Sequence, residues 1–194
     1  LDVLDIQHVS DGTDGPLAAT LEADYPEIEE AVRISRQFLW LQYEARVFSH
    51  GGLVVEPEFF DIFDFATVNG DPKTALQDAY TILLTEETAK KLIPDADPIG
   101  KIVSLDGLDQ KGDYTVTGIL KNPKYSSLRF DFITTTTSPG ILKDRMDHWI
   151  LGAQHRPFSA WVLLREGVDP KDLEPKIQSV LSHLGPTQAK KVTY

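Results

Sequence analysis

The order of the predicted secondary structure constrains this fold more than any single motif. Strand–helix–strand units are predicted at both ends of the chain, and short β-branched and apolar runs separated by turns fill the middle. Two βαβ units that are distant in sequence can pair into one sheet with helices on one face. We therefore predict an α+β fold with a discontinuous lobe formed by residues 1–55 and 157–194. Residues 56–156 are then an inserted, β-rich second lobe.

The N-terminal unit is predicted from apolar spacing and from proline. Residues 1–9 and 28–34 each have the apolar pattern of a strand. Pro16 can open a helix because its missing N–H would be unpaired there, and Pro26 ends that helix. A hairpin over residues 38–55 follows.

The remaining elements are predicted in the same way. The middle of the chain is expected to contain short helices at 57–63, 86–93 and 141–151 and strands at 80–84, 101–105, 114–120 and 131–137. The C-terminal unit is expected to contain a strand at 159–164, a helix that begins at Asp169-Pro170 and ends at Gly185-Pro186, and a last strand that begins near Val192.

Composition excludes several classes of function. The chain has no cysteine, which excludes disulfides, zinc–thiolate sites and thiol nucleophiles. Its net charge of −11 disfavours nucleic-acid binding, because phosphates are bound by clustered Lys and Arg. No apolar run approaches the ~20 residues that span a bilayer. Both ends interrupt an apolar pattern, and we expect the chain to be a fragment of a longer membrane protein.

No constellation of catalytic or metal-binding residues emerges from the sequence. The five histidines include no His-x-x-x-His pair, and neither a Gly-x-Ser-x-Gly elbow nor a phosphate-binding glycine loop is present. The acidic clusters that contain Asp61, Asp64, Asp95 and Asp97 are explained by the 30 acidic residues of the chain. We predict no catalytic, cofactor-binding or metal-binding residues. A hydrolase built on those four carboxylates is an alternative, which their replacement by alanine tests.

One strand of the predicted hairpin carries the aromatic residues Phe38, Trp40 and Tyr43. If their face is exposed, these side chains can contact a partner or an apolar substrate. We favour the simpler interpretation that they belong to the core.

Several segments resemble one family of bacterial membrane-protein domains. They occur in the family's order and spacing: YPEIE with AVR (25–33), EFFDIF (58–63), NGDP (69–72), ILLTE with AKK (82–91), DPIGK (97–101), DYTVTGI (113–119) and SSLRFDF (126–132). These segments are similar to the periplasmic core domain of MacB-like, FtsX-like ABC transporter permeases, in the form seen in Bacteroidetes-type bacteria. The resemblance covers most of the chain, and its motifs are those of turns and strands.

The resemblance implies a domain between the first two membrane helices of a permease, on the periplasmic face of the inner membrane. Such domains have a porter-like lobe and an inserted lobe called Sabre, which matches the division predicted above. The implied partners are a cytoplasmic ATPase, a second permease copy, and a periplasmic adaptor, lipoprotein or hydrolase. ATP-driven movement would then transmit force for export, efflux or signalling. The alternative is a stand-alone extracytoplasmic binding or sensory module.

Overall fold

The computed structural model of this 194-residue chain describes residues 12–107, 110–123, 126–140, 143 and 158–183. Contacts divide the chain into a terminal unit, Leu1–Ile34 with Asp144–Tyr194, and a central unit, Ser35–Lys143. The α+β class is confirmed. In this division residues 35–55 lie in the central unit. The expected lobe bounds, residues 1–55 with 157–194 and residues 56–156, stay a prediction. The description of the two units as porter-like and Sabre-like lobes stays a prediction.

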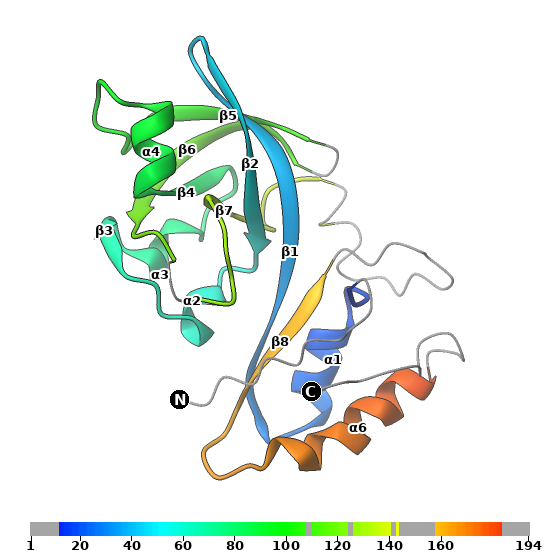
Figure 1. The fold of residues 1–194 in the computed structure, drawn as a ribbon. Coiled ribbons are helices and arrows are strands. Elements are labelled where there is room, and N and C mark those ends of the chain that lie inside the picture. Colours follow the sequence, from blue (N-terminus) through cyan, green and yellow to red (C-terminus); the bar gives the residue numbers. More distant parts are fainter. Residues whose placement is uncertain (1–11, 108–109, 124–125, 141–142, 144–157, 184–194) are drawn as a thin grey trace. The chain divides into compact units, whose positions relative to one another are not determined.

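In its described residues, the terminal unit contains two strands and two helices (Figure 1). In chain order these are α1 (Leu17–Asp24), the first part of β1 (Ile28–Tyr43), β8 (Ser159–Leu164) and α6 (Pro170–His183). β1 pairs antiparallel with β8, from Ile28 opposite Leu164 to Ile34 opposite Ser159. The expected strands at residues 1–9 and near Val192 lie outside the described residues.

The two helices of the terminal unit pack against its strands. Leu17 and Leu21 of α1 are buried in one apolar cluster with Ile177 of α6 and with Val162 of β8. Ile28 and Ala31 of β1 complete this cluster from the paired strand. The predicted arrangement of helices against a sheet is therefore present in the described part of this unit.

β1 is one strand where the sequence analysis expected two. It continues for 16 residues through Ser35-Arg36-Gln37, a segment that contains neither glycine nor proline. Nothing in that segment interrupts the extended backbone, and β1 therefore enters the central unit directly. Glu44, with a φ of 51°, lies in the turn that leads into the next strand.

The central unit holds the remaining elements. They are β2 (Arg46–Val55), α2 (Phe59–Ile62), β3 (Thr67–Asn69), α3 (Pro72–Ala75), β4 (Thr81–Thr85), α4 (Glu86–Leu92), β5 (Ile102–Asp106), β6 (Lys111–Leu120) and β7 (Phe132–Thr135). The strands that the sequence analysis expected in this part of the chain are thus confirmed. The helices expected at 57–63 and 86–93 are confirmed as well. Most residues of the helix expected at 141–151 lie outside the described part of the chain.

The strands of the central unit close into a barrel. Neighbouring strands follow the order β2-β7-β4-β6-β5-β1, and β1 also pairs with β2. The β2–β7 and β4–β6 pairs are parallel, while β4–β7, β5–β6 and β1–β5 are antiparallel. Closure satisfies both hydrogen-bonding edges of every strand in the circuit.

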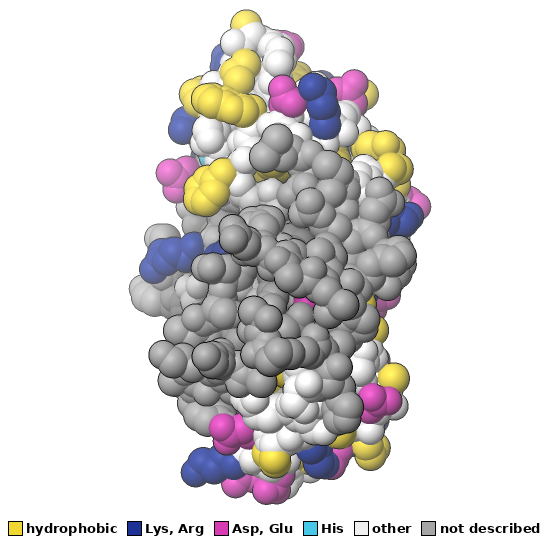
Figure 2. Space-filling view, turned by 90° about the vertical axis from the view of Figure 1, so that its right-hand side faces the viewer, with side chains coloured by type: hydrophobic (Ala, Val, Ile, Leu, Met, Phe, Trp, Pro, Cys, Tyr) yellow, Lys and Arg dark blue, Asp and Glu magenta, His cyan; other side chains and the backbone are white. Residues whose placement is uncertain are grey.

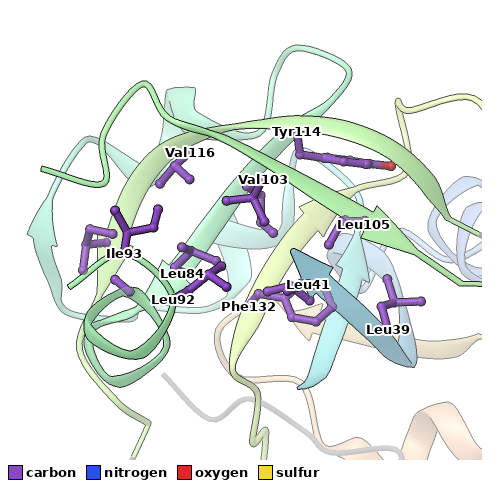
Figure 3. Close-up of a cluster of buried hydrophobic side chains, with 13 residues drawn as sticks. Leu39, Leu41, Leu84, Leu92, Ile93, Val103, Leu105, Tyr114, Val116 and Phe132 are labelled. Atoms are coloured by element: carbon purple, nitrogen blue, oxygen red, sulfur yellow. The ribbon is translucent and has the colours of Figure 1, made fainter. Parts of the chain in front are cut away.

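The inside of this barrel is the apolar core of the central unit. Its side chains come from β1, β4, β5, β6, β7 and α4. Figure 3 shows them directed toward one another. Leu41 of β1, Val103 of β5 and Phe132 of β7 are fully buried there, and Leu92 enters from α4. β1 therefore forms one wall of the core, against which side chains of the other strands pack.

Residues in the family-like segments cap a helix and stabilise a turn. Thr85 Oγ1 accepts a hydrogen bond from Thr88 N at the start of α4, at 3.3 Å. Asp97 Oδ1 accepts one from Ile99 N at 3.0 Å, and Gly100 then adopts a φ of +76°, which favours glycine. These two segments have the scaffold role that the sequence analysis inferred from the turn and strand character of the motifs.

Gly52 of β2 has no room for a side chain between the barrel wall and the core. A Cβ atom there would lie 2.2 Å from Cζ of Phe132, a ring that is itself fully buried. We expect Gly52→Ala to lower the free energy of unfolding by about 1–3 kcal/mol, measured by urea denaturation. Gly51→Ala is the matched control, since its Cβ would meet only the exposed Phe38 ring. Equal stability of the two variants would contradict this packing.

An ion pair joins Glu27, which directly precedes β1, to α6 in the terminal unit. Lys176 Nζ donates to Glu27 Oε1, and this hydrogen bond is the main cause that lowers the pKa of Glu27 below its ordinary 4.5. A carboxylate whose pKa is lowered by folding stabilises the folded state at pH values above its ordinary pKa. This stabilisation is lost as the pH falls through the pKa of the folded state.

We therefore expect Glu27→Gln to lower the urea midpoint at pH 7 and to lose this effect progressively below about pH 4.5. The exposed neighbour Glu29 gives the control variant Glu29→Gln, which should change little at either pH. An effect of Glu27→Gln that persists unchanged at pH 3 would contradict the ion-pair assignment.

Candidate functional site

Phe38 and Trp40 are exposed on the outer surface of the barrel. Their exposed fractions are 84% and 56%, whereas Leu39 and Leu41 between and beside them are buried. This alternation follows from the two-residue period of a strand. The favoured interpretation that the aromatic side chains are core is wrong for Phe38 and Trp40. Tyr43 differs from both, because it is partly buried and packs against the barrel core.

The strands beside β1 set the surroundings of these two rings. The Phe38 ring lies over Gly51 of β2, where a Cβ atom would come within 3.2 Å of it. Trp40 lies opposite Asp106 of β5. Figure 2 shows hydrophobic side chains among charged ones near the top of the view, where Figure 1 places the β1–β2 hairpin. The aromatic pair thus lies on the outer surface with Gly51 of β2 beside Phe38 and Asp106 of β5 opposite Trp40.

A pocket of about 470 Å³ lies beside Phe38. Its walls come from β1, β2, the junction of β4 with α4, the residues that follow β6, and the residues that precede β7. Phe38 and Phe130 contribute aromatic surface to it, and Phe130 is buried. The ring of Phe130 packs edge-on against Phe65, with 5.1 Å between ring centroids, so an aromatic cluster supports this wall.

Asp131 is the most firmly held charged residue of the pocket. Its backbone is anchored on both sides, because Asp131 N donates to Gly51 O at 2.7 Å and Thr85 N donates to Asp131 O at 2.9 Å. Its Oδ2 accepts from Gly51 N at 3.2 Å and lies 3.0 Å from Nδ1 of the buried His50. The carboxylate therefore has a fixed position, with its side chain about half exposed.

Glu87 and Asn122 also line the pocket and are joined by paired hydrogen bonds. Glu87 N donates to Asn122 Oδ1, and Asn122 Nδ2 donates to Glu87 Oε2, each at 3.3 Å. Arg129 also lines the pocket and is exposed, and its carbonyl oxygen accepts from Arg36 Nη1 at 3.4 Å. Two carboxylates and one guanidinium therefore surround an aromatic surface.

The four carboxylates that the sequence singled out have other roles or positions. Asp61 pairs with Lys73 and Asp95 with Arg46, each at 3.1 Å, and Asp97 caps a turn. Asp64 is exposed. Among the described residues, no group of three or more His, Cys, Asp or Glu side chains is placed to hold a metal ion.

The sequence analysis missed this pocket. Its lining residues are far apart in the chain and share no spacing that marks a site, and only barrel closure brings them together. Thr85, Glu87 and Asp131 lie in or beside the family-like segments, but a cap and a strand end explain those positions equally well.

Comparisons with a family model and with solved structures agree on the family that this chain resembles. A family model described as the MacB-like periplasmic core domain matches residues 3–180. No curated protein sequence matches the chain. Among the described residues, none of the helices combines the length and the apolar character that crossing a membrane requires.

Three solved structures share the fold. A domain from Porphyromonas gingivalis, assigned provisionally to a permease, has a TM-score of 0.72 and 24% identity, and the match covers 93% of this chain and 81% of that one. The periplasmic region of MacB from Actinobacillus actinomycetemcomitans has a TM-score of 0.67 and 17% identity, covering 93% and 78%. The extracellular domain of the ABC-type transporter YknZ from Gram-positive bacteria has a TM-score of 0.60 and 13% identity, covering 94% and 87%.

The outward position of Phe38 is testable by comparison with its buried neighbour. We expect Phe38→Ser to change the free energy of unfolding by less than about 0.5 kcal/mol, because the ring is exposed. Leu39→Ala should lower it by about 2–5 kcal/mol, because it leaves a cavity in the barrel core. Urea denaturation followed by circular dichroism measures both. A Phe38→Ser variant as unstable as Leu39→Ala would show that the two side chains are not separated across the barrel wall.

Proposed function

Because this chain belongs to the family of MacB-like periplasmic core domains of ABC transporter permeases, we propose that it couples cytoplasmic ATP hydrolysis to work outside the membrane. The family match over residues 3–180 carries this proposal. In it, the domain sits on the periplasmic face of the bacterial inner membrane. A second permease copy and a cytoplasmic ATPase, joined to it through membrane helices, complete the transporter.

The architecture supports a mechanical role. Closed barrels have no free strand edges, and a packed interior moves as a unit because it resists compression. Rigid-body movement of such a domain transmits displacement without chemistry. In this proposal the displacement acts on a transported substance or passes a signal to a partner. The partner is an adaptor, a lipoprotein or a hydrolase.

We place the partner contact on the outer face of β1. Phe38 and Trp40 are large, rigid and exposed, which is the character of residues that dominate protein interfaces. Tyr43 takes a supporting role, because it packs against the core on the other side of the strand.

Site-directed spin labels test the ATP-linked movement directly. The chain contains no cysteine, so Lys90→Cys on α4 and Lys171→Cys on α6 each introduce one label in a different unit. Both positions are exposed. In the full permease with its ATPase, and with cysteines elsewhere replaced, we expect the distance between labels on the two copies to differ between nucleotide-free and ATP-trapped states. The measurement is double electron–electron resonance.

Unchanged distances at both label positions in a preparation that hydrolyses ATP would contradict the proposal. An ATPase variant that binds but cannot hydrolyse ATP serves as the reference for the trapped state.

The sequence of the parent gene separates this function from the stand-alone sensory module. If the chain is part of a permease, the parent protein should have apolar segments of about 20 residues on both sides of it. A parent protein without them would favour the sensory module.

A further inference from the structure

We propose that the pocket beside Phe38 binds a basic side chain, Arg or Lys, that a partner protein presents next to apolar residues. The proposal rests on the proposed function only in expecting such a partner. Its ligand chemistry is derived from the pocket itself.

The carboxylates of the pocket have unused acceptor capacity. Asp131 uses Oδ2 for Gly51 and His50, and Glu87 uses Oε2 for Asn122. In the described part of the chain, neither Asp131 Oδ1 nor Glu87 Oε1 has a hydrogen-bond partner. A guanidinium or ammonium group is the complement of such oxygens, because charge-assisted hydrogen bonds to carboxylate are the strongest that side chains form.

The aromatic residues add a second attraction for a cation. Both Phe38 and Phe130 line the pocket, and Phe38, whose ring is exposed, is the one that a cation can reach from solvent. A cation over an aromatic face is attracted by the ring quadrupole, and the flat guanidinium of Arg also stacks on it. The chain itself contains this type of contact, since Lys91 Nζ lies 4.6 Å from the centroid of the Phe48 ring.

The balance of charge among the described residues of the pocket favours a cation over an anion. Of the lining residues that the structure describes, two are carboxylates and one, Arg129, is a guanidinium, and Asp131 is tied to β2 and β4 through its backbone. No ion pair joins Arg129 to either carboxylate in the described part of the chain, and its exposed side chain can turn toward solvent. An anion that reached Arg129 would also meet Asp131 and Glu87.

The surface outside the pocket defines the rest of the partner. Trp40 lies two residues beyond Phe38 on the same face of β1 and is 56% exposed. A partner whose basic side chain fills the pocket therefore places its neighbouring residues against an aromatic surface. A segment that alternates apolar and basic residues fits this arrangement, with Arg129 and Arg36 available to an acidic residue at the margin.

Capped peptides test the chemistry on the 194-residue chain. The probes are acetyl-Ala-Leu-Arg-Leu-Ala-amide and the same peptide with citrulline, which keeps the shape of Arg without its charge, or with Glu in the third position. Binding is measured by titration in two-dimensional ¹⁵N NMR. We expect the Arg peptide to shift the amide signals of Gly51, Asn122 and Asp131 at millimolar concentration, and we expect the other two peptides to leave them in place.

Matched variants locate the site. Glu87→Gln and Asp131→Asn should each weaken binding of the Arg peptide about tenfold, because each removes one charged acceptor. Asn at 131 can still accept from Gly51 N, and Glu87 lies outside the core, so at least one variant keeps the fold. Glu86→Gln removes a charge from the same turn of α4 outside the pocket and should leave binding unchanged.

Each other outcome overturns the proposal. Equal binding of the Arg and citrulline peptides would show that charge is not recognised. Preferential binding of the Glu peptide would make this an anion site centred on Arg129. If none of the three peptides shifted the amide signals, the pocket would not bind a basic side chain. ATP-linked movement of the full permease is measured separately, so either proposal can fail while the other stands.

Discussion

The pairing of β1 with β5 on one side and with β2 on the other closes the barrel of the central unit, and the rest of that unit depends on this closure. Without β1, the edges of β2 and β5 would have unpaired backbone groups, and the apolar core would lose the wall formed by Leu39 and Leu41. The same strand pairs with β8 in the terminal unit. β1 therefore supplies backbone hydrogen bonds and core side chains to both parts of the chain.

Closure also determines what the barrel exposes. Because side chains alternate along a strand, the register that buries Leu39 and Leu41 must expose Phe38 and Trp40. It also brings β2, β7 and the β4–α4 junction together around Asp131, where the pocket forms. The exposed aromatic pair and the pocket are thus two consequences of one register, and they lie side by side because both include Phe38.

The sequence predicted the scaffold better than the site, for physical reasons. Strands such as β4 and β8, and the Thr85 cap of α4, depend on local patterns that a sequence displays. The alternation of Phe38 and Trp40 with Leu39 and Leu41 was also visible in the sequence, but the face that turns inward depends on pairing with β2 and β5. The pairing of the first part of β1 with β8, which ends at Ile34, joins residues more than 120 positions apart in the chain and leaves no local mark in the sequence. The pocket needs the convergence of segments more than 90 residues apart, from Phe38 to Asp131, which no local pattern records.

The central claim is that β1 closes the barrel, and native-state hydrogen exchange tests it most directly. If β1 completes the circuit, its paired amides within residues 35–43 should exchange only through global unfolding of the central unit, as slowly as those of β6. Free energies of exchange in this part of β1 far below those of β6 would mean that the strand opens independently. The barrel would then be an open sheet, and the register that joins the aromatic pair to the pocket would not be fixed.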